Sequence, residues 1–166
     1  MEVKSLGNTT ERLSRAELKT EKIKAVSRSE PLTARMGTSL GAAIEQMRAG
    51  EGECLLICDG KRLVGMLTES DVLLKVLGRD IDLNKPVDEL MTREPEVISP
   101  DATVLEGLET MDRVGYRSLP LIDARGELAG VLRQQDVLEY VSEAFPQEIL
   151  NLPPRPHQLM EQPEGA

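Results

Sequence analysis

The segment Gly65–Asp71, which reads Gly-Met-Leu-Thr-Glu-Ser-Asp, holds residues whose types and spacing could bind a ligand. It closes an apolar run and leads into a predicted helix. At such a helix start, unpaired backbone N–H groups and the helix dipole favour an anion such as phosphate. Asp71, three residues after Thr68, could accept hydrogen bonds from a ribose diol. Both residues also fit a helix N-cap with an acidic N3 partner, worth about 1 kcal/mol without any ligand.

Enzyme motifs are missing from the chain. The sequence contains neither Gly-x-Gly-x-x-Gly nor Gly-x-x-x-x-Gly-Lys-Ser/Thr, the two glycine-rich phosphate loops. The single histidine, His157, follows a Pro-rich stretch near the C-terminus, so it is badly placed to serve as a base for a serine or cysteine. We therefore expect no catalytic residues, no enzyme activity and no catalytic cofactor.

The two cysteines, Cys54 and Cys58, lie in a strand-like apolar run. Four strand steps separate them by about 13 Å, which exceeds the limit of about 7 Å between the Cα atoms of a disulfide. We expect two reduced core residues. A metal site would need further thiolates or imidazoles, and we predict none.

The net charge and the length of the apolar runs argue against nucleic acid and membranes as binding partners. The chain has 166 residues and a formal charge of -9, which disfavours nucleic acid because that binding needs Lys and Arg to neutralise phosphates. Residues 1–28 carry a local excess of basic side chains, either an arm for an acidic partner or a solvated helix. The longest apolar run, Cys54–Cys58, is far shorter than the about 18 residues that suggest a membrane span. We expect a cytoplasmic protein without membrane contact.

An internal repeat organises the chain. The segment from Glu30 realigns with the segment from Glu94 at an offset of 64 residues, which becomes 65 after one extra residue in the turn 124–126. Identical residues then pair in register; they are Glu45 with Glu109, Met47 with Met111, Leu55 with Leu119, Asp59 with Asp123, Gly65 with Gly130, Leu67 with Leu132 and Asp71 with Asp136. The chain therefore contains two copies of a unit of about 50 residues.

Each copy shows the same order of predicted elements. Short extended stretches at 32–34 and 96–98 precede helices whose apolar residues recur at i, i+4 and i+7. Two apolar runs separated by a turn follow in each copy and predict hairpins at 53–68 and 117–132. A second helix is predicted at about 70–77 and 135–144. The predicted fold class is α+β, with two tandem β-α-β-β-α units.

Four features together resemble the CBS domain, named after cystathionine β-synthase. They are Gly-x-x-Thr-x-x-Asp at 65–71, the segment 87–95, the helix entry Pro-Asp-Ala-Thr-Val at 100–104 and Gly-Tyr-Arg-Ser-Leu-Pro at 115–120. Their order and doubling over residues 24–144 look like the paired arrangement called a Bateman module. The resemblance implies a stand-alone, non-catalytic energy sensor with pseudo-two-fold symmetry. It would bind AMP, ADP, ATP or S-adenosylmethionine in clefts between the two copies.

The resemblance also implies site residues. In the first cleft Asp71 would hold a ribose and Thr68 a phosphate, with Val97, Ile98 and Ala102 near the adenine. The second cleft would use Asp136 for the ribose, with Leu32, Thr33 and Ala34 around the base. The loop Tyr116–Arg117 would supply a phosphate contact, since Arg117 can fork two donors onto an anion. Arg117 could equally be a surface arginine at a strand start.

The sequence departs from the family pattern in two places. Arg133 replaces the hydroxyl residue of the second motif, and the first copy has Glu51-Gly52-Glu53 where the second has Gly115-Tyr116-Arg117. Two guanidinium groups, Arg117 and Arg133, would suit a di- or triphosphate in the second cleft. Glu53 would repel a phosphate, so the first cleft suits a monophosphate or stays empty. Alternatively, Arg133 points into solvent and the second cleft binds no ligand.

We expect four segments: an N-terminal arm at 1–23, a first CBS domain at 24–80, a second at 81–145 and a Pro-rich tail at 146–166. The stretch Val72–Leu77 is apolar on more than one face, which predicts a homodimer unless the N-terminal segment covers it. The adenosine nucleotide would act as a regulatory ligand whose signal passes to an unidentified effector protein. The alternative function is a CBS-type interaction scaffold that has lost ligand binding.

Overall fold

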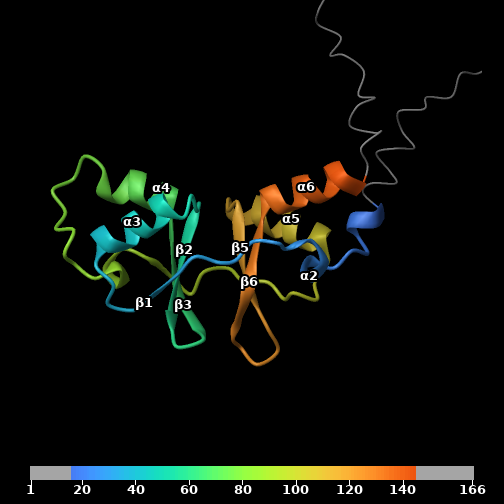
Figure 1. Cartoon of the computed structure of the whole chain (residues 1–166), viewed down its shortest axis with the longest axis horizontal. Helices are drawn as coiled ribbons and strands as arrows, with labels where there is room; N and C mark the ends of the chain where they lie inside the picture. Colours follow the sequence, from blue (N-terminus) through green and yellow to red (C-terminus); the bar gives the residue numbers. More distant parts are fainter. Residues whose placement is uncertain (1–15, 145–166) are drawn as a thin grey trace, which may run out of the picture.

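The computed structural model describes residues 16–144 of the chain. The elements, in chain order, are α2 (Ile23–Val26), β1 (Thr33–Arg35), α3 (Leu40–Ala49), β2 (Cys54–Asp59), β3 (Arg62–Thr68), α4 (Glu69–Asp71), η1 (Val72–Val76), η2 (Val87–Glu89), β4 (Thr92–Arg93), α5 (Val104–Val114), β5 (Ser118–Ile122), β6 (Leu128–Arg133) and α6 (Gln134–Ala144). Two halves stand side by side, with α3 to α6 along one edge and both hairpin turns at the other (Figure 1). The α+β prediction is confirmed.

The first half is built on a four-stranded sheet in the order β1-β2-β3-β4. Strand β1 runs parallel to β2, and β2 and β3 form the predicted antiparallel hairpin, whose turn contains Gly60 at a φ of 60°. That positive φ suits glycine, which has no Cβ to clash. Ser39 begins α3 by accepting a hydrogen bond from the backbone N–H of Ala42.

The second half repeats this plan with fewer strand residues. Strands β5 and β6 pair antiparallel, and the expected first strand at 96–98 is reduced to one parallel bridge between Ile98 and Leu121. Helix α5 begins at the predicted capping box, in which Thr103 and Glu106 exchange hydrogen bonds. It ends at Gly115, which adopts the left-handed conformation.

The segment before each first strand crosses to the opposite half. The Val104 N–H donates to the carbonyl of Glu21 over 2.9 Å, and the Leu40 N–H donates to the carbonyl of Lys85 over 2.8 Å. Each pair of positions is related to the other by the repeat offset of 64. This reciprocal exchange is the pseudo-two-fold symmetry that the resemblance implied.

Because the segments before the two first strands cross over, each of them is buried in the hydrophobic core of the opposite half. Ile23 and Val26 of α2 are buried in the core of the second half, whereas Val87 and Met91 are buried in the core of the first. Segments at the expected domain starts, 24–80 and 81–145, thus contribute core residues to the opposite half. A third cluster, centred on Cys54, Leu56 and Met66 with Tyr116 and Leu128 against it, lies between the two sheets.

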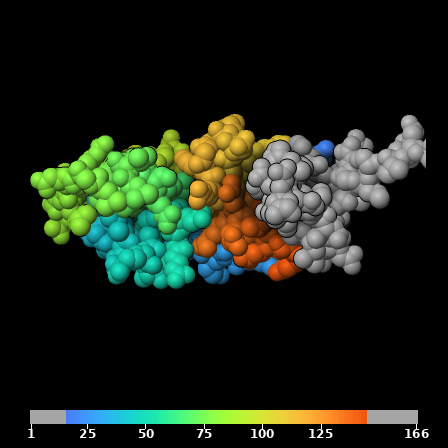
Figure 2. Space-filling view, turned by 90° about the horizontal axis from the view of Figure 1, so that it is seen from above, coloured from blue at the N-terminus to red at the C-terminus, as the bar shows by residue number. Residues whose placement is uncertain are grey.

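The helix predicted at 70–77 has a different form. Only Glu69–Asp71 is α-helical, and Val72–Val76 continues as a π-helix whose last bond runs from the Leu77 N–H to the Val72 carbonyl. Leu73 and Leu74 in this π-helix and Leu77 directly after it are exposed. The view onto the helical edge shows this part of the first half and α6 of the second at the surface (Figure 2).

The structure also bears on the cysteines, on membrane-spanning helices and on metal-binding clusters. Cys54 and Cys58 are both buried and free, as predicted. Within residues 16–144, no helix is long and apolar enough to span a membrane. The same residues contain no group of three or more His, Cys, Asp or Glu side chains that could hold a metal ion.

Candidate functional site: two clefts between the halves

A pocket of about 500 Å³ lies at the start of α4 in the first cleft. It brings together Thr68, Asp71, Tyr116 and Arg117, four residues that the sequence analysis singled out. The first two come from the first half and the other two from the loop before β5 in the second. The pocket is therefore formed between the two halves, with a hydroxyl, a carboxylate and a guanidinium on its wall.

Asp71 already has partners on both carboxylate oxygens. Its Oδ2 accepts hydrogen bonds from the Thr68 N–H and hydroxyl, both at 2.9 Å, while the Asp71 N–H donates back to Thr68 Oγ1. Its Oδ1 lies 2.7 Å from Lys75 Nζ. Burial alone would raise the pKa of Asp71, but the hydrogen bonds from Lys75 and Thr68 outweigh it, so the pKa lies below its ordinary value. The N-cap alternative for Thr68 and Asp71 is thus realised as a full capping box.

The three residues expected around the first adenine do not line this pocket. Ile98 and Ala102 are half-buried and pack against the core of the second half. Val97 is exposed. The structure therefore does not join them to Thr68 and Asp71 in one cavity.

In the second cleft, Asp136 is buried at the start of α6, with 2% of its surface exposed. Its Oδ1 accepts a hydrogen bond from the Ser29 hydroxyl at 2.9 Å, and its Oδ2 accepts one from the Arg133 N–H at 3.1 Å. Ser29 belongs to the segment that crosses from α2 to β1. Although Arg133 replaces the usual hydroxyl residue, Asp136 still satisfies a backbone donor at the helix start.

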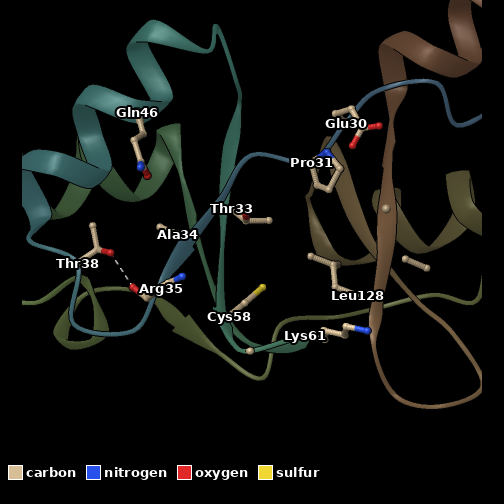
Figure 3. A pocket seen from close by; sticks show the side chains of 13 residues that line it. Glu30, Pro31, Thr33, Ala34, Arg35, Thr38, Gln46, Cys58, Lys61 and Leu128 are labelled. Atoms are coloured by element: carbon tan, nitrogen blue, oxygen red, sulfur yellow. Dashed lines mark hydrogen bonds between the residues drawn. The ribbon is translucent and has the colours of Figure 1, made fainter.

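A cavity of about 700 Å³ lies in the same cleft, below the crossing segment (Figure 3). Thr33 and Ala34 line it from one half, and Leu128, Ala129 and Gly130 line it from the other. Leu32, the third residue expected near this base, instead packs against the core of the first half. Two of the three residues expected around this base therefore line one cavity.

Sequence reasoning missed other residues of this cavity, among them Arg35, Thr38, Gln46, Cys58 and Lys61. They come from three separate stretches, namely the end of β1 and the turn after it, helix α3 and the β2–β3 hairpin. Only the pairing of β1 with β2 and the approach of the second half bring them together. The one available signal was the position of Arg35 and Thr38 directly after the expected base-contacting residues.

Arg117 and Arg133 occupy different surroundings. Arg117 is exposed and lines the Asp71 pocket as well as a third pocket of about 590 Å³ at the start of α6; Glu53, its counterpart under the repeat, also lines both. Arg133 is half-buried near Cys54. Burial raises the pKa of the Cys54 thiol, and a Ser118 hydrogen bond and the charge of Arg133 offset this only in part. The thiol therefore stays protonated and unreactive at neutral pH.

Comparison with known proteins gives the family. The CBS domain model matches residues 23–78 and again 87–143. The chain therefore belongs to the CBS domain family and contains two such domains, as predicted. A 17.7 kDa protein of Acidianus ambivalens is 27% identical over 117 residues, which cover 70% of each chain. CBS domain-containing proteins of Arabidopsis thaliana are 30% identical over 112 residues, but this chain spans only 20% of their length.

Solved structures share the fold. A CBS domain protein of Pyrobaculum aerophilum, solved in complex with AMP, has a TM-score of 0.65 at 19% identity over 73% of this chain and 98% of its own. The CBS domain pair of protein MJ0100, in complex with 5-methylthioadenosine and S-adenosyl-L-methionine, has a TM-score of 0.65 at 23% identity over 72% of this chain and 98% of its own. At these identities the likeness establishes the fold of a CBS domain pair.

Proposed function

We propose that this chain is a non-catalytic regulatory module that binds an adenosine-containing ligand between its two CBS domains. The ligand class is AMP, ADP, ATP or S-adenosylmethionine, in keeping with the AMP, methylthioadenosine and S-adenosylmethionine complexes of CBS domain pairs with the same fold. The observation that carries the proposal is the cavity of about 700 Å³ between β1 and β6. Its volume lies within the about 300–1,000 Å³ typical of small-molecule sites.

The second cleft offers the chemistry for a nucleoside. The base lies against Thr33 and Ala34, and the ribose diol reaches Asp136. Because Asp136 is buried and already accepts a hydrogen bond from Ser29, a ribose hydroxyl either replaces the serine or shares the carboxylate with it. A carboxylate offers about four acceptor positions, so sharing is geometrically possible.

Charge distinguishes the two clefts for a phosphate-bearing ligand. Arg133, three residues before Asp136, gives the second cleft a guanidinium group that favours a di- or triphosphate, whereas Arg117 lines the pocket of the first cleft. In the first cleft the Asp71 carboxylate is already in an ion pair with Lys75, and Glu53 adds a negative charge to the pocket wall. We propose that this cleft takes at most a monophosphate, through Thr68, Tyr116 and Arg117.

The alternative function is an interaction scaffold without a ligand. It is favoured by the occupied carboxylates, since Asp71 and Asp136 both have protein partners on each oxygen. On either reading the output passes to an effector protein. We further propose that the protein acts in the cytoplasm as a homodimer, in which the exposed leucines of η1 are covered.

Equilibrium unfolding in urea with and without added ligand distinguishes the two functions. AMP, ADP, ATP and S-adenosylmethionine are each added at several concentrations, with GMP as the control for an unspecific phosphate effect. A ligand at about 100 times its Kd should raise the free energy of unfolding by about 2.7 kcal/mol. A scaffold that has lost ligand binding shows no concentration-dependent change with any of the four.

A further inference from the structure

We infer that the chain holds one purine base, in the second cleft, and that the first cleft is closed to a base. This inference rests on the proposed function, because it selects between the two clefts of that module. The evidence comes from comparing pairs of positions related by the internal repeat. The symmetric fold makes these pairs equivalent, so their differences show what each cleft can accept.

The crossing segments differ in how tightly they close their clefts. In the first cleft, β4 pairs with β3 in antiparallel register, Gly65 with Arg93 and Met66 with Thr92. This pairing continues the sheet across the cleft. The equivalent segment in the second cleft forms no strand with β6, and the described contacts there include one hydrogen bond from the Ser27 hydroxyl to the Val131 carbonyl.

The glycines of the two motifs show the same difference. A methyl group built on Gly65 would overlap the side chain of Met91, so sulfur and methylene groups cover that glycine. At the equivalent Gly130, the nearest atoms are Leu121 Cδ1 at 3.5 Å and Ser27 Oγ at 3.9 Å. Ser27 is the counterpart of Met91, and this smaller side chain leaves room beside β6, where Gly130 lines the cavity.

Side-chain size follows the same trend around the base position. Ala34, Ala129 and Cys58 line the cavity of the second cleft. Their counterparts in the first cleft are the larger aliphatic residues Ile98, Val64 and Ile122. The second cleft therefore carries the smaller side chain at all three positions.

The second cleft also holds a side-chain amide that can read a base. The Gln46 side chain lines the cavity together with the Thr38 hydroxyl, on the α3 side (Figure 3), and among the described residues no hydrogen bond to the Gln46 amide is found. The counterpart of Gln46 is Thr110, whose hydroxyl donates to the Glu106 carbonyl within its own helix. An amide offers both donors and an acceptor to a purine edge. Gln46 is thus the specificity-determining residue for the base.

Isothermal titration calorimetry of the full chain with AMP tests this inference. We expect a stoichiometry of one AMP per chain. Ala129→Val, which copies the first cleft at an exposed strand position, should weaken AMP binding at least tenfold, because a single extra carbon can change a pocket's affinity by about 10–200-fold. Gln46→Ala should weaken it about tenfold, since a base edge then loses its partner. Both variants are checked for native circular dichroism.

The matched controls lie at the repeat-related positions. Val64→Ala and Thr110→Ala change the first cleft and should leave AMP affinity within twofold of wild type. Two AMP molecules per chain, or weakening by the control variants instead, would overturn the inference while the proposed function stands. If the wild-type chain binds none of AMP, ATP and S-adenosylmethionine, the proposed function fails as well.

Discussion

Ser29 donates its hydroxyl hydrogen to Asp136 Oδ1 across 2.9 Å, linking the segment that enters the first CBS domain to the start of α6 in the second. The two residues are 107 positions apart in the chain. In the first cleft, Asp71 Oδ1 is instead paired with Lys75, which lies one helical turn further along the same domain. The two motif carboxylates therefore have different structural roles. Asp136 links the two domains, whereas Asp71 stabilises the start of its own helix.

Replacing Ser29 tests the contact between the domains. Ser29→Ala leaves Oδ1 of a buried carboxylate without its partner, which should lower the free energy of unfolding by about 1–3 kcal/mol. The measurement is urea unfolding at pH 7. Ser70→Ala, at an exposed serine, is the control and should stay within about 0.5 kcal/mol of wild type. Equal stability of Ser29→Ala and wild type would show that the hydrogen bond contributes nothing.

The pH dependence of stability follows from Asp71. Its pKa in the folded protein lies below the about 3.9 of an unperturbed aspartate. A depressed carboxyl pKa stabilises the fold above about pH 4, and this stabilisation is lost as the pH falls through the folded value. We expect Asp71→Asn to cost about 1 kcal/mol at pH 7, the usual worth of a cap, and little near pH 2.

The measurement for Asp71 is urea unfolding of both proteins between pH 2 and pH 7. Asp80→Asn, at an exposed aspartate, serves as control. A stability difference between Asp71→Asn and wild type that stays constant across this range would refute the assignment of a depressed pKa to Asp71.

A homodimer is expected from the surface of η1. Leu73, Leu74 and Leu77 are 59%, 71% and 60% exposed, so three neighbouring apolar side chains face solvent in the single chain. Light scattering should give twice the chain mass of 18.3 kDa, and Leu74→Asp should yield monomers. A wild-type monomer at high concentration would contradict the dimer and favour coverage by the N-terminal segment of the same chain.

Arg133 should favour ligands with several phosphates. Arg133→Thr restores the family's usual hydroxyl and removes one cation, so ATP affinity should fall about tenfold while AMP affinity changes less, because charged hydrogen bonds contribute about 1.5–3 kcal/mol. Calorimetric titrations with both nucleotides measure this difference. Arg79→Thr controls for net charge. A variant that binds ATP as well as wild type, or better, would mean that Arg133 plays no part in recognition.

Much of the fold could be predicted because it depends on local patterns. The repeat predicted two units, and apolar runs separated by turn residues predicted the hairpin at 53–68 that β2 and β3 form. The π-helix at Val72–Val76 could not be predicted, since its residues also suit an ordinary helix. Nor could the packing of Ile23 and Val26 in the second core, because that placement depends on a long-range exchange between the domains.

Site residues could be predicted where a sequence motif carries them, as for Thr68 and Asp71 in one half and Tyr116 and Arg117 in the other. Thr68 and Asp71 share a pocket because a single turn positions them. The partners of the carboxylates were missed: Lys75 lies a helical turn away, and Ser29 arrives from a distant segment. Gln46 was missed because nothing in an exposed helix position reveals that the opposite domain completes a cavity there.

A crystal structure of the full chain grown with AMP is the most direct test of ligand binding between the two CBS domains. We expect one nucleotide per chain, with its base in the cavity between Ala34 and Gly130 and its ribose hydroxyls within hydrogen-bond distance of Asp136. A structure obtained at saturating AMP in which this cavity is unoccupied, or in which the nucleotide lies only outside the clefts, would show that the chain does not bind AMP in this way.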